Sequence, residues 1–311
     1  MTIGTHRLVL GTAQLGMQYG IANATGIPDR NAAVDIVLTA LRAGVNTLDT
    51  AHCYGVAESI LRDALALAVQ EGLPVPRVIT KLDTPLAEEA EQLSDKETIQ
   101  FVKQGVISSC RALGLEQLPV LLIRESWPLM RPTMFWETLL TLREQGLIHT
   151  LGLSAQSPAE VQLALKFPDI RHLQVPINIL DHRWRNSDVF AQISVRGDLT
   201  VHARSVFLQG LLLAGNNSLW PDVSQGCGPD VIHALLKAKQ MLNRSSLADL
   251  CTAYVLSYPQ ISGVVLGLET AEQLGENLRL LTAPALSNAE RKFVDDIIPY
   301  VPSALLNPSS W

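Results

Sequence analysis

The sequence has few of the features that mark secreted, membrane-bound or nucleic-acid-binding proteins. Only four cysteines occur in 311 residues. They are scattered and form no C-x-x-C pair, which argues against a disulfide framework and against a zinc site. No run reaches the roughly 18 apolar residues of a membrane helix, and the net charge of −6 leaves no basic excess for a phosphate backbone. We expect no metal, no membrane contact and no nucleic acid partner.

We also expect no secretory signal. The first residues, MTIGTHRLVLGTAQ, lack a basic stretch followed by a sustained apolar core. Hydrophobic residues make up 47% of the chain and charged residues 17%, which is typical of a globular protein with a large core. No low-complexity tract or internal boundary divides the sequence. We therefore expect a cytoplasmic protein with one domain over residues 1–311, present as a monomer or a small homo-oligomer.

What the chain does contain is a series of short apolar runs, separated by longer stretches of helical periodicity. Each run is too short for a helix and too uniformly apolar for a strand with one wet face. The eight runs cover residues 8–10, 45–48, 77–80, 119–123, 149–153, 172–175, 199–203 and 263–266. A strand followed by a helix, eight times over, predicts a (β/α)8 TIM barrel.

The helices predicted near the C-terminus exceed what a plain barrel needs. Segments 230–242 and 246–257 follow each other with no strand between them, after a stretch rich in Gly, Asn, Ser and Pro at 216–229. Two further helices, at 271–281 and 287–298, follow the last strand. The alternative is an open doubly wound sheet, but the glycines after the first strand do not lead into a helix as that fold requires. We expect a barrel with extra helices near the C-terminus.

Three polar residues follow the second and third predicted strands. Asp49 and Tyr54 come after the second strand, and Lys81 after the third. Taken alone, each has a plain structural interpretation: a turn former, a packed ring and a solvated charge. In a barrel, however, neighbouring strands end at the same mouth. An ammonium beside a phenol favours the phenolate, and a carboxylate keeps the ammonium charged and oriented. The trio therefore predicts a tyrosine that exchanges a proton during turnover.

These segments resemble the aldo-keto reductase superfamily, in order along the whole chain. Asp49-Thr50-Ala51-x-x-Tyr54-Gly55-x-x-Glu58 is similar to the stretch that supplies the Asp and Tyr of that family, and Ile79-Thr80-Lys81 to the stretch that supplies its Lys. The resemblance implies that Tyr54 donates a proton to a carbonyl oxygen, with Lys81 and Asp49 tuning it. It also implies that hydride passes directly between a nicotinamide and the substrate carbon.

The resemblance implies a cofactor site as well. Gln174, in the sixth strand, would meet the nicotinamide carboxamide, and the segment after the eighth strand would hold the adenosine half. The implied cofactor-binding residues are Gly11, Thr12, Asp49, Ser154, Gln174, Arg204, Ser205, Leu208, Gly210, Gly267, Gln273, Glu276 and Asn277.

Three positions depart from the family pattern. Arg124 stands where the family has a His that hydrogen-bonds the substrate carbonyl, Ala155 where an Asn helps to hold the carboxamide, and Arg204 where a Tyr often stacks on the nicotinamide. A guanidinium can also stack. Arg124 is a fourth candidate catalytic residue, because it offers donors and a permanent charge. It would favour the tyrosinate or bind a substrate carboxylate, unless it pairs with a local acid and has left the chemistry.

Three functions remain open at this point. The first is an oxidoreductase that interconverts an alcohol and a small-molecule carbonyl, such as an aldehyde, a ketone or a sugar-like substrate. The second is a reductase-like barrel that binds the cofactor as a sensor or subunit, with little turnover because Arg124 replaces the usual His. The third is a lyase with Lys81 as a Schiff-base amine, against which Asp49 and Tyr54 argue.

The cofactor is either NADP(H) or NAD(H). Glu269 and Gln273 stand where binders of the phosphorylated form tend to place basic or hydroxyl groups, which favours NAD(H). The family as a whole leans towards NADP(H).

Overall fold

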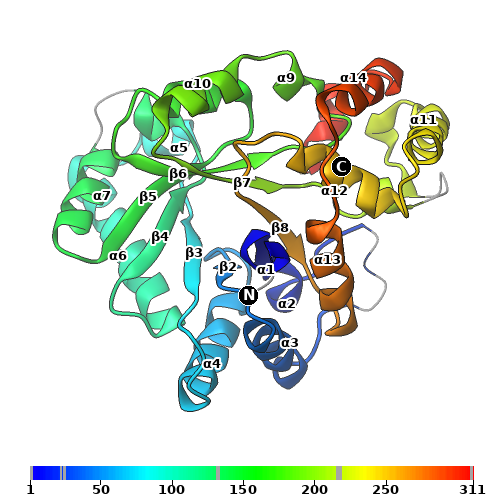
Figure 1. Cartoon of the computed structure of the whole chain (residues 1–311). Coiled ribbons are helices and arrows are strands. Elements are labelled where there is room, and N and C mark those ends of the chain that lie inside the picture. The colour runs from blue at the N-terminus through cyan, green and yellow to red at the C-terminus, as the bar shows by residue number, and fades with distance from the viewer. Residues whose placement is uncertain (1–2, 22, 24–25, 131–133, 215–218, 309–310) are drawn as a thin grey trace.

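The computed structural model describes residues 3–21, 23, 26–130, 134–214, 219–308 and 311. Within these residues, eight parallel strands close into a barrel in chain order, and β1 pairs with β8 to complete it (Figure 1). The strands are β1 Leu8–Gly11, β2 Thr47–Asp49, β3 Arg77–Leu82, β4 Leu118–Ile123, β5 Ile148–Ser154, β6 Ile170–Pro176, β7 Thr200–Arg204 and β8 Gly263–Gly267. The predicted TIM barrel is confirmed.

Several strands extend further than the apolar runs that predicted them. β3 continues through Lys81, β5 reaches Ser154 and β7 reaches Arg204. Backbone pairing continues after the apolar run has ended, since Lys81 lies opposite Leu122 and Arg204 opposite Pro176. An apolar run therefore marks the part of a strand that packs, and it stops short of the polar residues at the mouth. The candidate site residues of these strands belong to the barrel itself.

The sheet is buried on both faces, which explains the near-continuous apolar runs. Val9, Ile79, Val120 and Leu122 form a small buried cluster with Val265, and their alternation with neighbouring residues assigns them to the barrel interior. A much larger cluster lies between the strands and the surrounding helices.

Helices surround the barrel. They are α1 Ile3–Arg7, α2 Ala13–Gly16, α3 Arg30–Arg42, α4 Ala57–Gln70, α5 Ala87–Ala90, α6 Asp95–Leu113, α7 Met134–Glu144, α8 Pro158–Ala164, α9 His182–Arg185, α10 Val189–Arg196, α11 Gly228–Met241, α12 Leu247–Leu256, α13 Glu272–Thr282 and α14 Asn288–Ile297. The four helices predicted near the C-terminus lie close to the observed α11, α12, α13 and α14. Local signals explain where helices start: Asp29 caps α3 by accepting a hydrogen bond from the Ala32 amide at 2.9 Å, and Ser287 caps α14.

The extra helices gather on one side of the barrel. α11, α12 and α14 lie together there, in yellow to red in Figure 1, and α1 lies against α13 and β8. One expectation was wrong: the turn after β1 does lead into a single helical turn, α2. Part of the loop expected at 216–229 falls outside the described residues, and α11 already begins at Gly228. None of the helices in the described residues combines the length and hydropathy that crossing a membrane requires.

Candidate active site

The three residues singled out in the sequence meet at the mouth of the barrel. The Lys81 Nζ atom donates to the two carboxylate oxygens of Asp49 at 2.7 and 2.9 Å, and to the Thr50 carbonyl oxygen at 2.9 Å. It also lies 5.0 Å from the centroid of the Tyr54 ring. Asp49 and Lys81 are each 3% exposed. Neighbouring strands β2 and β3 thus place a buried ion pair beside a phenol.

The electrostatics of this pair keep the lysine charged. Burial alone would lower the pKa of the Lys81 ammonium, but the Asp49 carboxylate and the Tyr54 phenol outweigh it, so that the pKa is raised. Gln174 of β6 donates from Nε2 to Asp49 Oδ2 at 2.7 Å and completes the shell around this carboxylate. Because the ammonium is held in its charged form, Lys81 can stabilise a negative charge on a neighbouring oxygen.

Two glycines fix the turn that carries Tyr54. Gly55 has φ +57°, in the left-handed region that favours glycine. Gly16, at the end of α2, packs so closely that a Cβ atom there would lie 2.1 Å from the Tyr54 carbonyl oxygen and 2.6 Å from the Ala57 amide nitrogen. The helical turn after β1 and the turn after β2 are therefore interlocked by close backbone contact.

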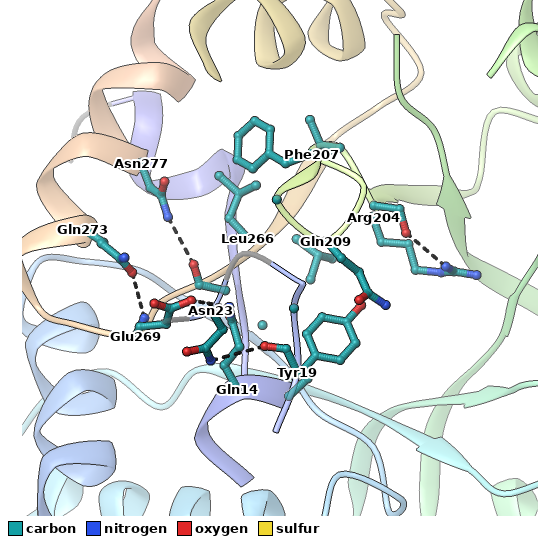
Figure 2. A pocket seen from close by; sticks show the side chains of 18 of the residues that line it. Gln14, Tyr19, Asn23, Arg204, Phe207, Gln209, Leu266, Glu269, Gln273 and Asn277 are labelled. Atoms are coloured by element: carbon teal, nitrogen blue, oxygen red, sulfur yellow. Dashed lines mark hydrogen bonds between the residues drawn. The ribbon is translucent and has the colours of Figure 1, made fainter. Parts of the chain in front are cut away.

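A groove lined by Asp49 and Tyr54 extends towards α13. Figure 2 labels ten of its lining residues, from Arg204 on one side to Gln273 and Asn277 of α13 on the other. Its inner end is lined by Asp49, Tyr54, Gln174 and Arg204. The other residues of the expected cofactor set that line it are Gly11, Thr12, Ser205, Gly210, Gly267, Gln273, Glu276 and Asn277. Four expected site residues are not among the described lining residues: Lys81, which is bonded to Asp49, together with Arg124, Ser154 and Leu208.

One wall of the groove is an unusual loop, Ser205 to Gly210, which follows β7. Ser205, Leu208 and Gln209 have positive φ values of 59°, 48° and 56°. Each such residue costs about 1–3 kcal/mol, and strain of this kind concentrates at functional sites. Among the residues that the structure describes, the backbone amides of Val206, Phe207 and Gln209 make no hydrogen bond within the protein. Amides left free beside a groove are suited to bind an anion.

The far end of the groove is acidic. Glu269 and Glu276 line it, and Gln14 donates from Nε2 to Glu269 Oε1 at 3.0 Å (Figure 2). Gln273 accepts a hydrogen bond from the Glu269 amide at 2.7 Å, which fixes the turn into α13. Arg204 is the only cation among the described lining residues, and it lies at the opposite end.

A model of the Aldo/keto reductase family matches residues 7–299. The chain belongs to this family. Family membership supports oxidoreduction between a carbonyl and an alcohol with a nicotinamide cofactor, in agreement with the resemblance found in the sequence.

Three oxidoreductases with similar sequences share between 21% and 31% of their aligned residues with this chain. The uncharacterized oxidoreductase YqkF of Bacillus subtilis is 21% identical over 292 residues, covering 91% of this chain and 93% of that protein. Pyridoxine 4-dehydrogenase of Escherichia coli is 31% identical over 190 residues, covering 57% and 63%. The NADH-specific methylglyoxal reductase of Escherichia coli is 24% identical over 305 residues, covering 88% and 89%.

Solved structures of aldo/keto reductases share the fold. The holo form of AKR11C1 from Bacillus halodurans superimposes with a TM-score of 0.74 at 22% identity, covering 94% of this chain and 92% of that one. Glycerol dehydrogenase AKR11B4 from Gluconobacter oxydans gives a TM-score of 0.71 at 22% identity, covering 94% and 90%. At this identity, the likeness concerns the fold alone.

Arg124 stands where aldo/keto reductases usually have a His, and its side chain contacts two residues at the rim of the barrel. The Arg124 Nη1 atom lies 3.0 Å from the Cys53 sulfur and 3.2 Å from Asp83 Oδ1, at the exposed rim. Among the described residues, Asp83 is therefore the local acid that lies within ion-pair distance of Arg124. Such an exposed pair contributes about 0–1 kcal/mol, so a substrate anion can compete with Asp83 for the guanidinium.

The groove residues that follow β1 carry no pattern in the sequence that predicted them. Gln14, Tyr19 and Asn23 line the groove, and the Tyr19 ring points to the side on which Arg204 lies (Figure 2). Burial raises the pKa of the Tyr19 phenol, and Tyr54 acts in the same direction. No periodicity or spacing marks these residues. The only available signal was their place after a strand end, where barrel enzymes carry their functional loops.

Proposed function

We propose that the chain is an NAD(H)-dependent oxidoreductase that interconverts a small carbonyl compound and its alcohol, with Tyr54 as general acid and base. The observation that carries this proposal is the position of Tyr54, at the inner end of the groove and beside the buried Lys81–Asp49 pair. A carbonyl placed there would have both a proton donor and a dinucleotide groove next to it.

In the groove, the amides after β7 would hold the pyrophosphate and Gln174 would face the carboxamide. The cofactor, when bound, supplies or accepts the hydride at the substrate carbon. In the direction of reduction, Tyr54 gives its phenolic proton to the carbonyl oxygen as that carbon gains hydride. The Lys81 ammonium stabilises the resulting phenolate. Tyr54 then recovers a proton from solvent, and in the direction of oxidation each step is reversed.

The lyase alternative is disfavoured by the environment of Lys81. A Schiff base requires a neutral amine that a substrate can reach. Lys81 is buried, is hydrogen-bonded to Asp49 and Thr50, and has a raised pKa.

The four cysteines are all free, which is consistent with a reducing compartment and with our proposal of a cytoplasmic protein.

Replacing Tyr54 with phenylalanine should lower kcat by about 10²–10⁴-fold, because the general acid is lost. The Kd of the cofactor should stay within about threefold, since the ring remains in place. We would measure turnover on a panel of aldehydes, ketones and sugars, and cofactor binding by fluorescence quenching.

Tyr19→Phe is the matched control, because Tyr19 is the other tyrosine among the described groove-lining residues. A loss of turnover in Tyr19→Phe but not in Tyr54→Phe would show that Tyr19, and not Tyr54, transfers the proton. Tight cofactor binding by the unaltered protein without turnover on any carbonyl would favour the sensor function instead.

The preference for NAD(H) rests on the acidic far end of the groove. A ribose diol can donate hydrogen bonds to Glu269. A 2′-phosphate would instead meet Glu269 and Glu276, and the described lining residues at that end of the groove include no cation. One relative is named as an NADH-specific reductase, which supports the same choice. NADH should bind at least about tenfold more tightly than NADPH.

Glu269→Lys should shift this ratio of Kd values towards NADPH by at least about tenfold. Glu272→Lys, the same change on α13 at a residue that is not among the described groove-lining residues, should leave the ratio nearly unchanged. If the unaltered protein prefers NADPH, or if both variants shift the ratio equally, Glu269 does not select the cofactor.

A further inference from the structure

Arg204 is held rigidly at the inner end of the groove. Its Nη2 atom donates to the Ala155 carbonyl oxygen at 3.0 Å and to Gln156 Oε1 at 2.9 Å, and Nη1 donates to Ser205 Oγ at 3.4 Å. The side chain lines the groove together with Tyr54. These neutral acceptors fix the plane of the guanidinium and leave its charge uncompensated.

No carboxylate in the described part of the chain lies within ion-pair distance of Arg204. Other buried or partly buried cations have a carboxylate partner: Lys81 is paired with Asp49, Arg183 with Asp181 and Arg244 with Asp249. The Nε atom of Arg204 is buried and has no hydrogen-bond partner.

Burial lowers the pKa of the Arg204 guanidinium. The nearby Tyr54 and Tyr19 phenols act in the opposite direction, as do the Asp49 and Glu160 carboxylates, which lie beyond ion-pair distance. A guanidinium nevertheless stays protonated in proteins. The inner end of the groove therefore contains a fixed positive charge, because the charges of Lys81 and Asp49 cancel each other.

This charge lies where the nicotinamide would react, if the proposed function holds. The substrate carbonyl must be within reach of both the Tyr54 phenol and the hydride-bearing ring. Arg204 and Tyr54 line the same end of the groove, so the ring would lie close to the guanidinium. The oxidised ring carries a positive charge and the reduced ring is neutral. A nearby cation in a poorly solvated site therefore disfavours the oxidised form alone.

We propose that Arg204 is a specificity-determining residue that makes the protein bind the reduced dinucleotide more tightly than the oxidised one, so that the reduced form occupies the groove when both forms are present. The inference rests on the proposed function. It follows from three observations. Hydrogen bonds fix the plane of the Arg204 guanidinium, no carboxylate among the described residues lies within ion-pair distance of it, and Arg204 lines the same end of the groove as Tyr54.

The test is a comparison of Kd values for NADH and NAD+ at one pH and salt concentration, by fluorescence for the reduced form and by competition for the oxidised form. The unaltered protein should bind NADH at least about tenfold more tightly than NAD+. Arg204→Gln should bring the ratio close to one, mainly by improving the binding of NAD+. Arg204→Lys, which keeps the charge, should keep the preference.

If Arg204 merely shaped the groove, changing it would weaken the binding of NADH and of NAD+ to the same extent. Equal affinities in the unaltered protein would overturn the inference without any variant, as would an unchanged ratio in Arg204→Gln. The proposed function fails separately, if neither NADH nor NADPH binds the unaltered protein. If NADPH is the tighter cofactor, the same comparison is made with NADPH and NADP+.

Discussion

Replacing Lys81 with methionine is expected to lower the free energy of unfolding by about 3–5 kcal/mol, because the Asp49 carboxylate is left buried without its counter-charge. Both side chains are 4% exposed, and their closest atoms are 2.7 Å apart. Gln174 remains as a hydrogen-bond donor to Asp49, but an amide carries no charge. Turnover should fall at least about 100-fold, since Tyr54 loses the adjacent cation. Urea unfolding and steady-state kinetics measure the two effects.

The double variant Asp49→Asn/Lys81→Met separates stability from chemistry. It removes both charges and keeps side chains of similar size, so most of the lost stability should return. Turnover should stay low, because the cation is still missing. A double variant as unstable as Lys81→Met would contradict the ion-pair explanation of the stability loss. Restored turnover would show that proton transfer does not depend on Lys81.

Acidification is expected to destabilise the protein through two buried histidines. His172 of β6 and His202 of β7 have ring centroids 4.5 Å apart. Within the described structure, both ring nitrogens of His172 and the Nδ1 atom of His202 lack a hydrogen-bond partner. Burial places the pKa of His172 well below its ordinary value, and His202 and Arg77 act in the same direction. Burial and Arg77 lower the pKa of His202 to about 4.

The direction of the pH effect follows from proton uptake by the unfolded chain. An unfolded histidine titrates near pH ~6.5, so below that pH the unfolded chain binds protons that the native chain does not. The stabilisation from His202 is therefore complete above pH ~6.5 and is lost towards pH 4, at about 1.4 kcal/mol per pH unit. With the same slope for His172, lowering the pH from 7 to 5 should cost about 4 kcal/mol.

Urea unfolding at pH 7 and at pH 5 measures this loss. His172→Gln and His202→Gln each remove one titrating ring, so each should show about half of the acid sensitivity of the unaltered protein. His233→Gln, at an exposed position of α11, is the control and should behave like the unaltered protein. If the first two variants are as acid-sensitive as the control, the buried pair is not the cause.

The parts of the fold that depend on burial were predictable from the sequence. A strand covered on both faces must be apolar along its length, and this requirement identified all eight strands of the barrel. Because the strands are parallel, Asp49 and Lys81 had to emerge at one mouth. Their 2.7 Å contact is a direct consequence of the pairing of β2 with β3.

The residues that shape the groove could not be predicted in the same way. Tyr19 follows a single helical turn after β1, and no periodic pattern fixes where its side chain points. The partners of Arg124 were equally hidden, because Cys53 and Asp83 come from two different loops. Charge and spacing identify which residues are available for chemistry. Loop conformation, which depends on contacts distant in sequence, decides which of them meet.

The strained turn after β7 has a thermodynamic consequence for ligand exchange. The Leu208 side chain is fully buried, and it anchors a backbone that already holds its high-energy shape. A dinucleotide that binds there would meet backbone amides of the turn that are already in position. The entropic cost of ordering that segment therefore arises during folding and not at each association. Departure would likewise need no rearrangement of the turn, and the same rigid surface would serve every catalytic cycle.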